Sequence, residues 1–203
     1  MDDSYRTLEN QAEGVYREKG SRFLAFGFPV KHENEIRDIL TGIRKKYHDA
    51  RHHCFAYRLG YRKETYRVYD DGEPSGTAGR PIYGQLVSHG LTNTLVVVVR
   101  YFGGTLLGKG GLMNAYRSAA MDMLSRSTII TRFVQVKLKM CFPYDVLNTV
   151  MKILKDEALI PGSPVYEASC SMYVMVREKS MNRLIDRLRT IPGLRYDSLQ
   201  IED

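Results

Sequence analysis

Apolar side chains recur along the first part of the chain with two periods, and these predict one amphipathic helix and several strands. Residues 33–47 place their apolar side chains at helical spacing with basic side chains near the opposite side, so we predict a helix there. The segments 21–30, 54–59 and 65–69 have the composition and alternation of strands. Residues 95–99 form a continuous apolar run with four β-branched side chains, which predicts a strand buried on both faces.

Two glycine-rich segments interrupt this pattern. Residues 70–81, with the sequence DDGEPSGTAGRP, contain three glycines and two prolines, so we expect no long regular element there. Residues 103–111 form a second glycine-rich loop after the buried strand. A helix is expected to follow that loop, because apolar side chains recur at helical spacing from Leu112 to Met123. We expect the functional surface within residues 70–81 and 99–111.

The pattern restarts near residue 129, which predicts a second domain. The elements expected after that point are, in order, a strand at 131–141, a helix at 144–157, one bent strand or two strands at 165–177, a helix from 181 that Ser180 can cap, and a strand at 194–201. The order β-α-β-β-α-β within about 75 residues is that of a split βαβ, ferredoxin-like fold. We predict an α+β protein with domains at residues 1–128 and 129–203.

Composition and charge narrow the function classes without choosing one. The net charge of +7 and the pI of about 9.3 favour anionic partners such as nucleic acid, ribosomes or phosphorylated ligands. The longest apolar run has five residues and no apolar segment follows the acidic N-terminus, so we expect neither a membrane-spanning helix nor a secretory signal. Three widely spaced cysteines indicate a reducing compartment, so we expect a cytoplasmic protein. No segment pairs a basic face with a large apolar one, so we expect no membrane partner.

The glycine-rich loop at 103–111 nearly fits a phosphate-binding loop. Gly103, Gly108 and Lys109 match the pattern G-x-x-x-x-G-K, but Gly110 stands where Ser or Thr would hold magnesium. We therefore expect no nucleotide hydrolysis, while simple anion binding by free backbone N–H groups stays open. The alternative is close packing of helix and strand around the glycines.

The segment 70–81 carries three carboxylates within four positions, Asp70, Asp71 and Glu73. Such a group can hold a hard cation, accept hydrogen bonds or act as acid and base. Ser75 and Thr77 are possible nucleophiles, although no known nucleophile motif surrounds them. The alternative is a rigid turn whose carboxylates cap backbone N–H groups or pair with Arg100.

Histidines and a cysteine cluster at His48, His52, His53 and Cys54, which raises the question of a metal. No compact second ligand pair completes a zinc set, so we assign no metal, and His53 is interpreted as a polar member of the main site.

Arginines and tyrosines alternate through the predicted hairpin between residues 57 and 69. Tyrosines can stack on bases while cations meet phosphates, so this segment is a candidate nucleic-acid surface. The candidate residues are Arg58, Tyr61, Arg62, Lys63 and Arg67. The alternative is a solvated hairpin face with extended arginines.

Three of these segments together resemble the IMPACT/YigZ family in its bacterial two-domain form. They are HHCFAYRLG at 52–60, DDGEPSGTAGRPI at 70–82 and VVVRYFGGTLLGKGGL at 97–112. KGSRF at 19–23 and FPYD at 142–145 fit the starts of the two family domains, so the resemblance covers nearly the whole chain.

The resemblance implies an N-terminal domain with the fold shared by a ribosomal small-subunit protein and domain IV of elongation factor G. It also implies a ferredoxin-like C-terminal domain similar to domain V of that factor. Eukaryotic relatives carry a different partner domain, which this chain lacks, and act in translational control under amino-acid stress.

Our leading interpretation is a non-catalytic regulator of translation that binds RNA, the ribosome or a translation factor, without a cofactor. One alternative is an enzyme for a small anionic or nucleotide-like substrate; another is a protein-interaction adaptor. We expect Asp71, Glu73, Thr77, Arg100 and Lys109 to line one cleft, with His53 nearby. The complete set of candidate ligand- or anion-binding residues is His53, Asp70, Asp71, Glu73, Ser75, Thr77, Arg100, Gly103, Gly104, Lys109 and Gly110.

Overall fold

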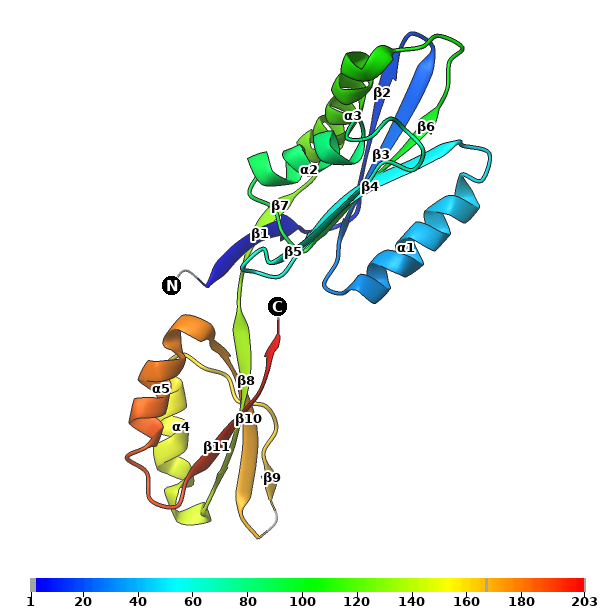
Figure 1. Ribbon diagram of the computed structural model, residues 1–203. Coiled ribbons are helices and arrows are strands. Elements are labelled where there is room, and N and C mark those ends of the chain that lie inside the picture. The colour runs from blue at the N-terminus through cyan, green and yellow to red at the C-terminus, as the bar shows by residue number, and fades with distance from the viewer. Residues whose placement is uncertain (1–2, 167, 203) are drawn as a thin grey trace. The chain divides into compact units, whose positions relative to one another are not determined.

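The computed structural model describes residues 3–166 and 168–202, which form two compact units (Figure 1). Residues 5–132 make the N-terminal unit, and residues 3–4 join residues 133–202 in the C-terminal unit. The division falls between residues 132 and 133 rather than between 128 and 129. Strand β7 (Ile129–Phe133) accounts for the difference, because it pairs with strand β1 (Ser4–Leu8).

A five-stranded sheet forms the centre of the N-terminal unit. Its strands are β2 (Ala12–Glu18), β3 (Ser21–Pro29), β4 (His52–Leu59), β5 (Thr65–Tyr69) and β6 (Thr94–Tyr101). They lie in the order β2-β3-β6-β4-β5 and neighbouring strands are antiparallel. Helix α1 (Glu33–Lys46) covers one face, and helices α2 (Gly79–Ser88) and α3 (Gly108–Ser125) cover the other (Figure 1).

The central strand β6 separates two apolar cores. Val96 and Val98 pack in the core under α2 and α3, and Val97 and Val99 pack in the core under α1. Successive side chains of a strand point to opposite faces, so only apolar residues satisfy both cores. The prediction of a strand buried on both faces is confirmed.

Two helices begin earlier than the glycine content indicates. Helix α2 starts at Gly79, inside the segment where no long regular element was expected, and α3 starts at Gly108. Residues 108–111 are therefore the first turn of a helix and not part of a loop. Strands β1 and β2 were also not predicted, because β1 is short and β2 lies at a sheet edge with only partly buried side chains.

The C-terminal unit has the predicted ferredoxin-like topology. Its strands are β8 (Gln135–Phe142), β9 (Val165–Tyr166), β10 (Cys170–Arg177) and β11 (Arg195–Glu202), in the sheet order β11-β8-β10-β9. Helices α4 (Leu147–Asp156) and α5 (Met181–Leu188) lie on one face of this sheet (Figure 1). This is the order expected when two βαβ units interleave.

Some details of the C-terminal prediction differ from the structure. The strand expected at 131–141 is two strands, because the Val134 N–H donates to the Asp3 carbonyl at 2.8 Å instead of continuing one ladder. The segment 165–177 contains two strands, and residue 167 within it lies outside the described residues. Ser180 occupies the N-cap position of α5, but its side chain makes no capping hydrogen bond. No helix in the described ranges is long and apolar enough to cross a membrane.

Candidate functional site

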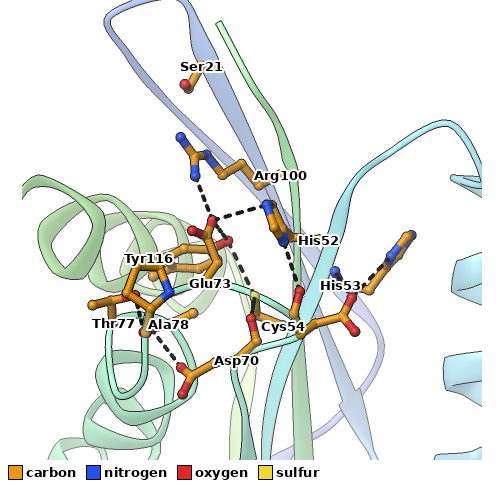
Figure 2. Close-up of polar contacts among 12 residues, drawn as sticks. Ser21, His52, His53, Cys54, Asp70, Glu73, Thr77, Ala78, Arg100 and Tyr116 are labelled. Carbon is orange, nitrogen blue, oxygen red and sulfur yellow. Dashed lines mark hydrogen bonds and ion pairs between the residues drawn. The ribbon is translucent and has the colours of Figure 1, made fainter. Parts of the chain in front are cut away.

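The pairing of β4 with β6 decides which side chains face α2 and α3. His52 lies opposite Arg100 and His53 lies opposite Val99, so the two histidines point to opposite faces of the sheet. His52 and Arg100 point toward Glu73, whereas His53 points toward the α1 side (Figure 2). The histidine of this site is therefore His52 and not the predicted His53.

Glu73 is the centre of a buried polar network (Figure 2). Its Oε1 accepts hydrogen bonds from Arg100 Nη1 and from the Tyr116 hydroxyl, both at 2.7 Å, and lies 4.0 Å from His52 Nε2. The Glu73 and Arg100 side chains are only 3% and 6% exposed. Removing either partner would leave an uncompensated buried charge, so this ion pair stabilises the fold.

The Arg100 guanidinium is further enclosed by aromatic rings. It lies 5.5 Å from the ring centroid of Phe23 and 5.5 Å from that of Phe102, within the range of cation–π attraction. The sequence left open the alternative that a carboxylate of residues 70–81 pairs with Arg100. This pairing is confirmed for Glu73.

The Asp70 and Asp71 carboxylates hold their own segment in shape. Asp70 accepts hydrogen bonds from the backbone N–H groups of Gly76, Ala78 and Gly79 at 2.8–3.0 Å, which caps the start of α2. Asp71 accepts from the His53 N–H at 2.7 Å. It also pairs with Arg44 at 3.6 Å. These contacts match the alternative in which the carboxylates of residues 70–81 cap backbone N–H groups of a rigid turn. Neither the Asp70 nor the Asp71 carboxylate faces Arg100.

Ser75 and Thr77 do not join the Glu73 network. The Thr77 hydroxyl is buried and donates to the Pro74 carbonyl at 2.6 Å. Ser75 is exposed and lines a separate hollow together with Arg80 and Arg117. The expected single cleft is therefore wrong for Asp71 and Thr77, and holds for Glu73, Arg100 and Lys109, which line one pocket.

Cys54 and Tyr116 belong to the network but were not assigned to it from the sequence. Cys54 Sγ lies 3.0 Å from the Asp70 carbonyl oxygen and 3.3 Å from the Tyr116 hydroxyl. Burial raises the pKa of the Cys54 thiol and of the Tyr116 hydroxyl well above their ordinary values, so both stay protonated. A protonated, enclosed thiol is a poor nucleophile.

A pocket of 460 Å³ opens beside this network. Its polar lining residues are Arg51, His52, Glu73, Arg100 and Lys109, and its apolar lining residues are Pro74, Phe102, Leu106, Leu107 and Leu112. Phe102 is 50% exposed and Leu106 is 84% exposed, so the pocket mouth presents apolar side chains to solvent. Apolar walls with a few convergent polar groups are typical of ligand sites.

The glycines of the glycine-rich segment 103–111 have different structural roles. A side chain at Gly103 would place its Cβ 1.9 Å from the Gly20 carbonyl carbon, so Gly103 permits close packing of its loop on the β2–β3 turn. The Gly103 N–H also donates to Ser21 Oγ at 3.1 Å. Gly104 has a φ of +87°, and Gly110 lies in the first turn of α3.

The hairpin of β4 and β5 does not present one basic and aromatic face. Arg58 pairs with Tyr66 and Tyr57 pairs with Arg67, so successive arginines point to opposite sides of the sheet. Arg58 is half-buried, whereas Arg62, Lys63 and Arg67 are exposed. The Arg62 guanidinium lies 5.1 Å from the ring of Tyr61, a contact within the turn. Across residues 3–166 and 168–202, no group of three or more His, Cys, Asp or Glu side chains is arranged to hold a metal.

The family model and the related sequences that match this chain all point to the same family. A family model of the Impact N-terminal domain matches residues 19–124. The IMPACT family member YvyE of Bacillus subtilis (strain 168) is 31% identical over 88% of this chain and 82% of its own. An IMPACT family member from the pol 5′ region of Thermus thermophilus is 41% identical over 70% of this chain and 79% of its own.

One solved structure agrees with the fold over nearly the whole chain. The crystal structure of a hypothetical protein, 26% identical, covers 98% of this chain and 99% of its own with a TM-score of 0.72. The two-domain translational regulator Yih1 aligns with 59% of this chain and 48% of its own, at 23% identity and a TM-score of 0.38. That score is too low to support an inference about fold or function.

Proposed function

This chain belongs to the IMPACT family, and from that premise we propose that it is a non-catalytic regulator of translation that binds RNA, free or within the ribosome. The observation that carries the proposal is a row of exposed cations beside the pocket. We call this the basic rim; it consists of Arg17, Lys19, Arg22, Arg51 and Lys109. The link to translation comes from the resemblance to elongation factor domains and to eukaryotic relatives in translational control. In this proposal the protein acts in the cytoplasm.

The basic rim lies at one end of the sheet and includes residues on both of its faces. Arg17, Lys19 and Arg22 line one hollow together with Tyr101. Phe102 follows Tyr101 in the chain and lines the pocket with Arg51 and Lys109. Gly103 packs on the β2–β3 turn, so the loop after β6 lies against the turn that carries Lys19. Several cations interleaved with exposed aromatic side chains favour a nucleic-acid backbone over an isolated anion.

The same geometry argues against the enzyme alternative. That alternative needs Asp70, Asp71 or Glu73 as a base or metal ligand. Asp70 is occupied by three backbone N–H groups, and Glu73 is buried in an ion pair with Arg100. Both carboxylates therefore hold the fold in place, and no contact among the described residues gives either of them a catalytic role. The rim cations, in contrast, face solvent.

The dependence of RNA affinity on salt concentration tests this proposal. Each phosphate contact with a single strand contributes roughly 0.7 to the slope of log affinity against log salt. We expect the double variant Lys19→Ala/Lys109→Ala to bind single-stranded RNA more weakly, with a slope smaller by about 1.4. The matched control is Lys152→Ala/Lys155→Ala, which removes the same charge from exposed positions on α4. Equal slopes for the two double variants would contradict the proposal.

A further inference from the structure

The pocket beside Glu73 offers hydrogen-bonding groups of both kinds at its base. Arg100 supplies donors and Glu73 supplies an acceptor. His52 Nδ1 donates to the Asp71 carbonyl at 2.8 Å, so Nε2 of the neutral ring is a second acceptor. A simple anion would approach the Glu73 carboxylate and be repelled by it. A wholly apolar ligand would leave the polar base unpaired. The base therefore suits a ligand whose own edge carries both donors and acceptors.

Two further features of the pocket favour a polar ligand. Arg100 is 95% buried and lines the pocket, and its Nε is enclosed without a hydrogen-bond partner in the part of the chain that the structure describes. Buried donors in proteins are rarely left unpaired. In addition, the 18-residue helix α3 begins at the pocket with Gly108 and Lys109, and the side chain of its N-cap residue, Leu107, makes no capping hydrogen bond. Free N–H groups at a helix start favour a phosphate.

The walls, volume and nearby cations of the pocket indicate the size and chemistry of the ligand. Phe102 and Leu106 are 50% and 84% exposed and form an apolar mouth, and Phe102 offers a ring on which a planar group can stack. The volume of 460 Å³ lies within the range of about 300–1,000 Å³ that small-ligand sites occupy. Lys109 and Arg51 place positive charge where an attached phosphate would leave the pocket.

We propose that this pocket binds one unstacked nucleobase of single-stranded RNA. The base stacks on Phe102, its polar edge meets Arg100, Glu73 and His52, and its phosphate lies at the start of α3 beside Lys109. The inference rests on the proposed function and adds to it the site that receives a base turned out of the RNA strand. Stacking is available to every base, so we expect modest sequence preference.

The experiment measures binding of the full-length protein to a short single-stranded RNA and to the same strand with abasic nucleotides. Phe102→Ala should weaken binding to the normal strand about tenfold, because base–aromatic stacking contributes on that scale. Its salt slope should equal that of the wild type, because no phosphate contact is lost. Binding to the abasic strand should be the same for wild type and variant. Met121→Ala, which removes a 53% exposed apolar side chain near the other end of α3, should change neither affinity.

The failure of this inference can be separated from the failure of the proposed function. If Lys19→Ala/Lys109→Ala lowers RNA affinity but Phe102→Ala and Leu106→Ala do not, the pocket inference is overturned and RNA binding stands. If the wild type binds no RNA while adenosine 5′-monophosphate shifts the amide signals of Gly108 and Lys109, the proposed function is overturned and a nucleotide pocket is supported. If an acidic aromatic peptide shifts those signals and RNA does not, both are overturned. Thermal unfolding of Phe102→Ala verifies that the variant is folded.

Discussion

His52 and His53 are neighbours in sequence, but only His52 reaches the Glu73 network. Glu73, Arg100 and Lys109 could be selected from the sequence, because charged residues beside glycine-rich segments are unusual in a purely structural loop. The choice between the two histidines could not be made, since it depends on the register of β4 against β6. Tyr116 was recognised only as part of an apolar helix face, because its hydroxyl contact to Glu73 spans 43 positions of sequence.

The Arg100–Glu73 pair gives a prediction about stability. Arg100→Ala should lower the free energy of unfolding by about 3–5 kcal/mol, because Glu73 would be left buried without its charge partner. The double variant Glu73→Gln/Arg100→Met should lose less than Arg100→Ala alone. Chemical denaturation followed by circular dichroism measures both. A loss below about 1 kcal/mol for Arg100→Ala would mean that the pair is solvated.

Cys54 gives a prediction about reactivity. Burial raises the pKa of its thiol, so the reactive thiolate should remain scarce as the pH rises from about 7 to 9, where an ordinary cysteine ionises. In the native protein a maleimide should label the half-buried Cys141 well before Cys54, and in denaturant the two should label alike. Peptide mass spectrometry distinguishes the sites. Fast native labelling of Cys54 that increases with pH would show that the thiol is accessible.

Elements that depend on local periodicity were predictable, and elements fixed by distant partners were not. Helix α1 follows from helical spacing, strands β3 to β5 from alternation and composition, and strand β6 from a continuous apolar run, each within a single segment. The start of α2 does not, because it depends on an aspartate outside the helix that caps it. Strand β1 pairs with β7, more than a hundred residues away in sequence, so its own short pattern carries little information.

The cap at the start of α2 gives a prediction for this element. Asp70→Ala should cost about 2 kcal/mol of stability, because three backbone N–H groups lose their acceptor. Amide hydrogen exchange should accelerate at Gly76, Ala78 and Gly79. Asp70→Asn is the matched control, since it keeps one acceptor oxygen and should show a smaller effect. Unchanged exchange at these three amides in Asp70→Ala would contradict the capping role.

At the scale of the whole molecule, the N-terminal residues 3–4 belong to the C-terminal unit. Asp3 pairs with Arg177 through two hydrogen bonds, at 2.6 Å and 3.1 Å, and its side chain is only 2% exposed. The ferredoxin-like order could be predicted from the succession of strands and helices. The attachment of Asp3 could not, because the two residues are separated by 174 positions.

The Asp3–Arg177 pair predicts how stability depends on pH. The hydrogen bond from Arg177 lowers the pKa of Asp3 below its ordinary value of about 3.9. The pair therefore stabilises the folded state above that value, and the contribution is lost as the pH falls through the lowered pKa. Asp3→Asn should cost about 1–2 kcal/mol near neutral pH, less than a fully buried pair because Arg177 is 33% exposed. Denaturation of wild type and variant over a pH series should show the difference shrinking only in strong acid; a difference that grows there would contradict it.

The most direct test of RNA binding at the basic rim and pocket is photo-crosslinking of a 4-thiouridine-containing single-stranded RNA to the full-length protein, with the modified peptides identified by mass spectrometry. The predicted result is crosslinking within residues 101–109 and in the β2–β3 turn, at Tyr101 or Phe102 above all, because each of these two side chains lines a hollow together with rim cations. Crosslinks confined to the β4–β5 hairpin or to the C-terminal unit would contradict this placement of the RNA.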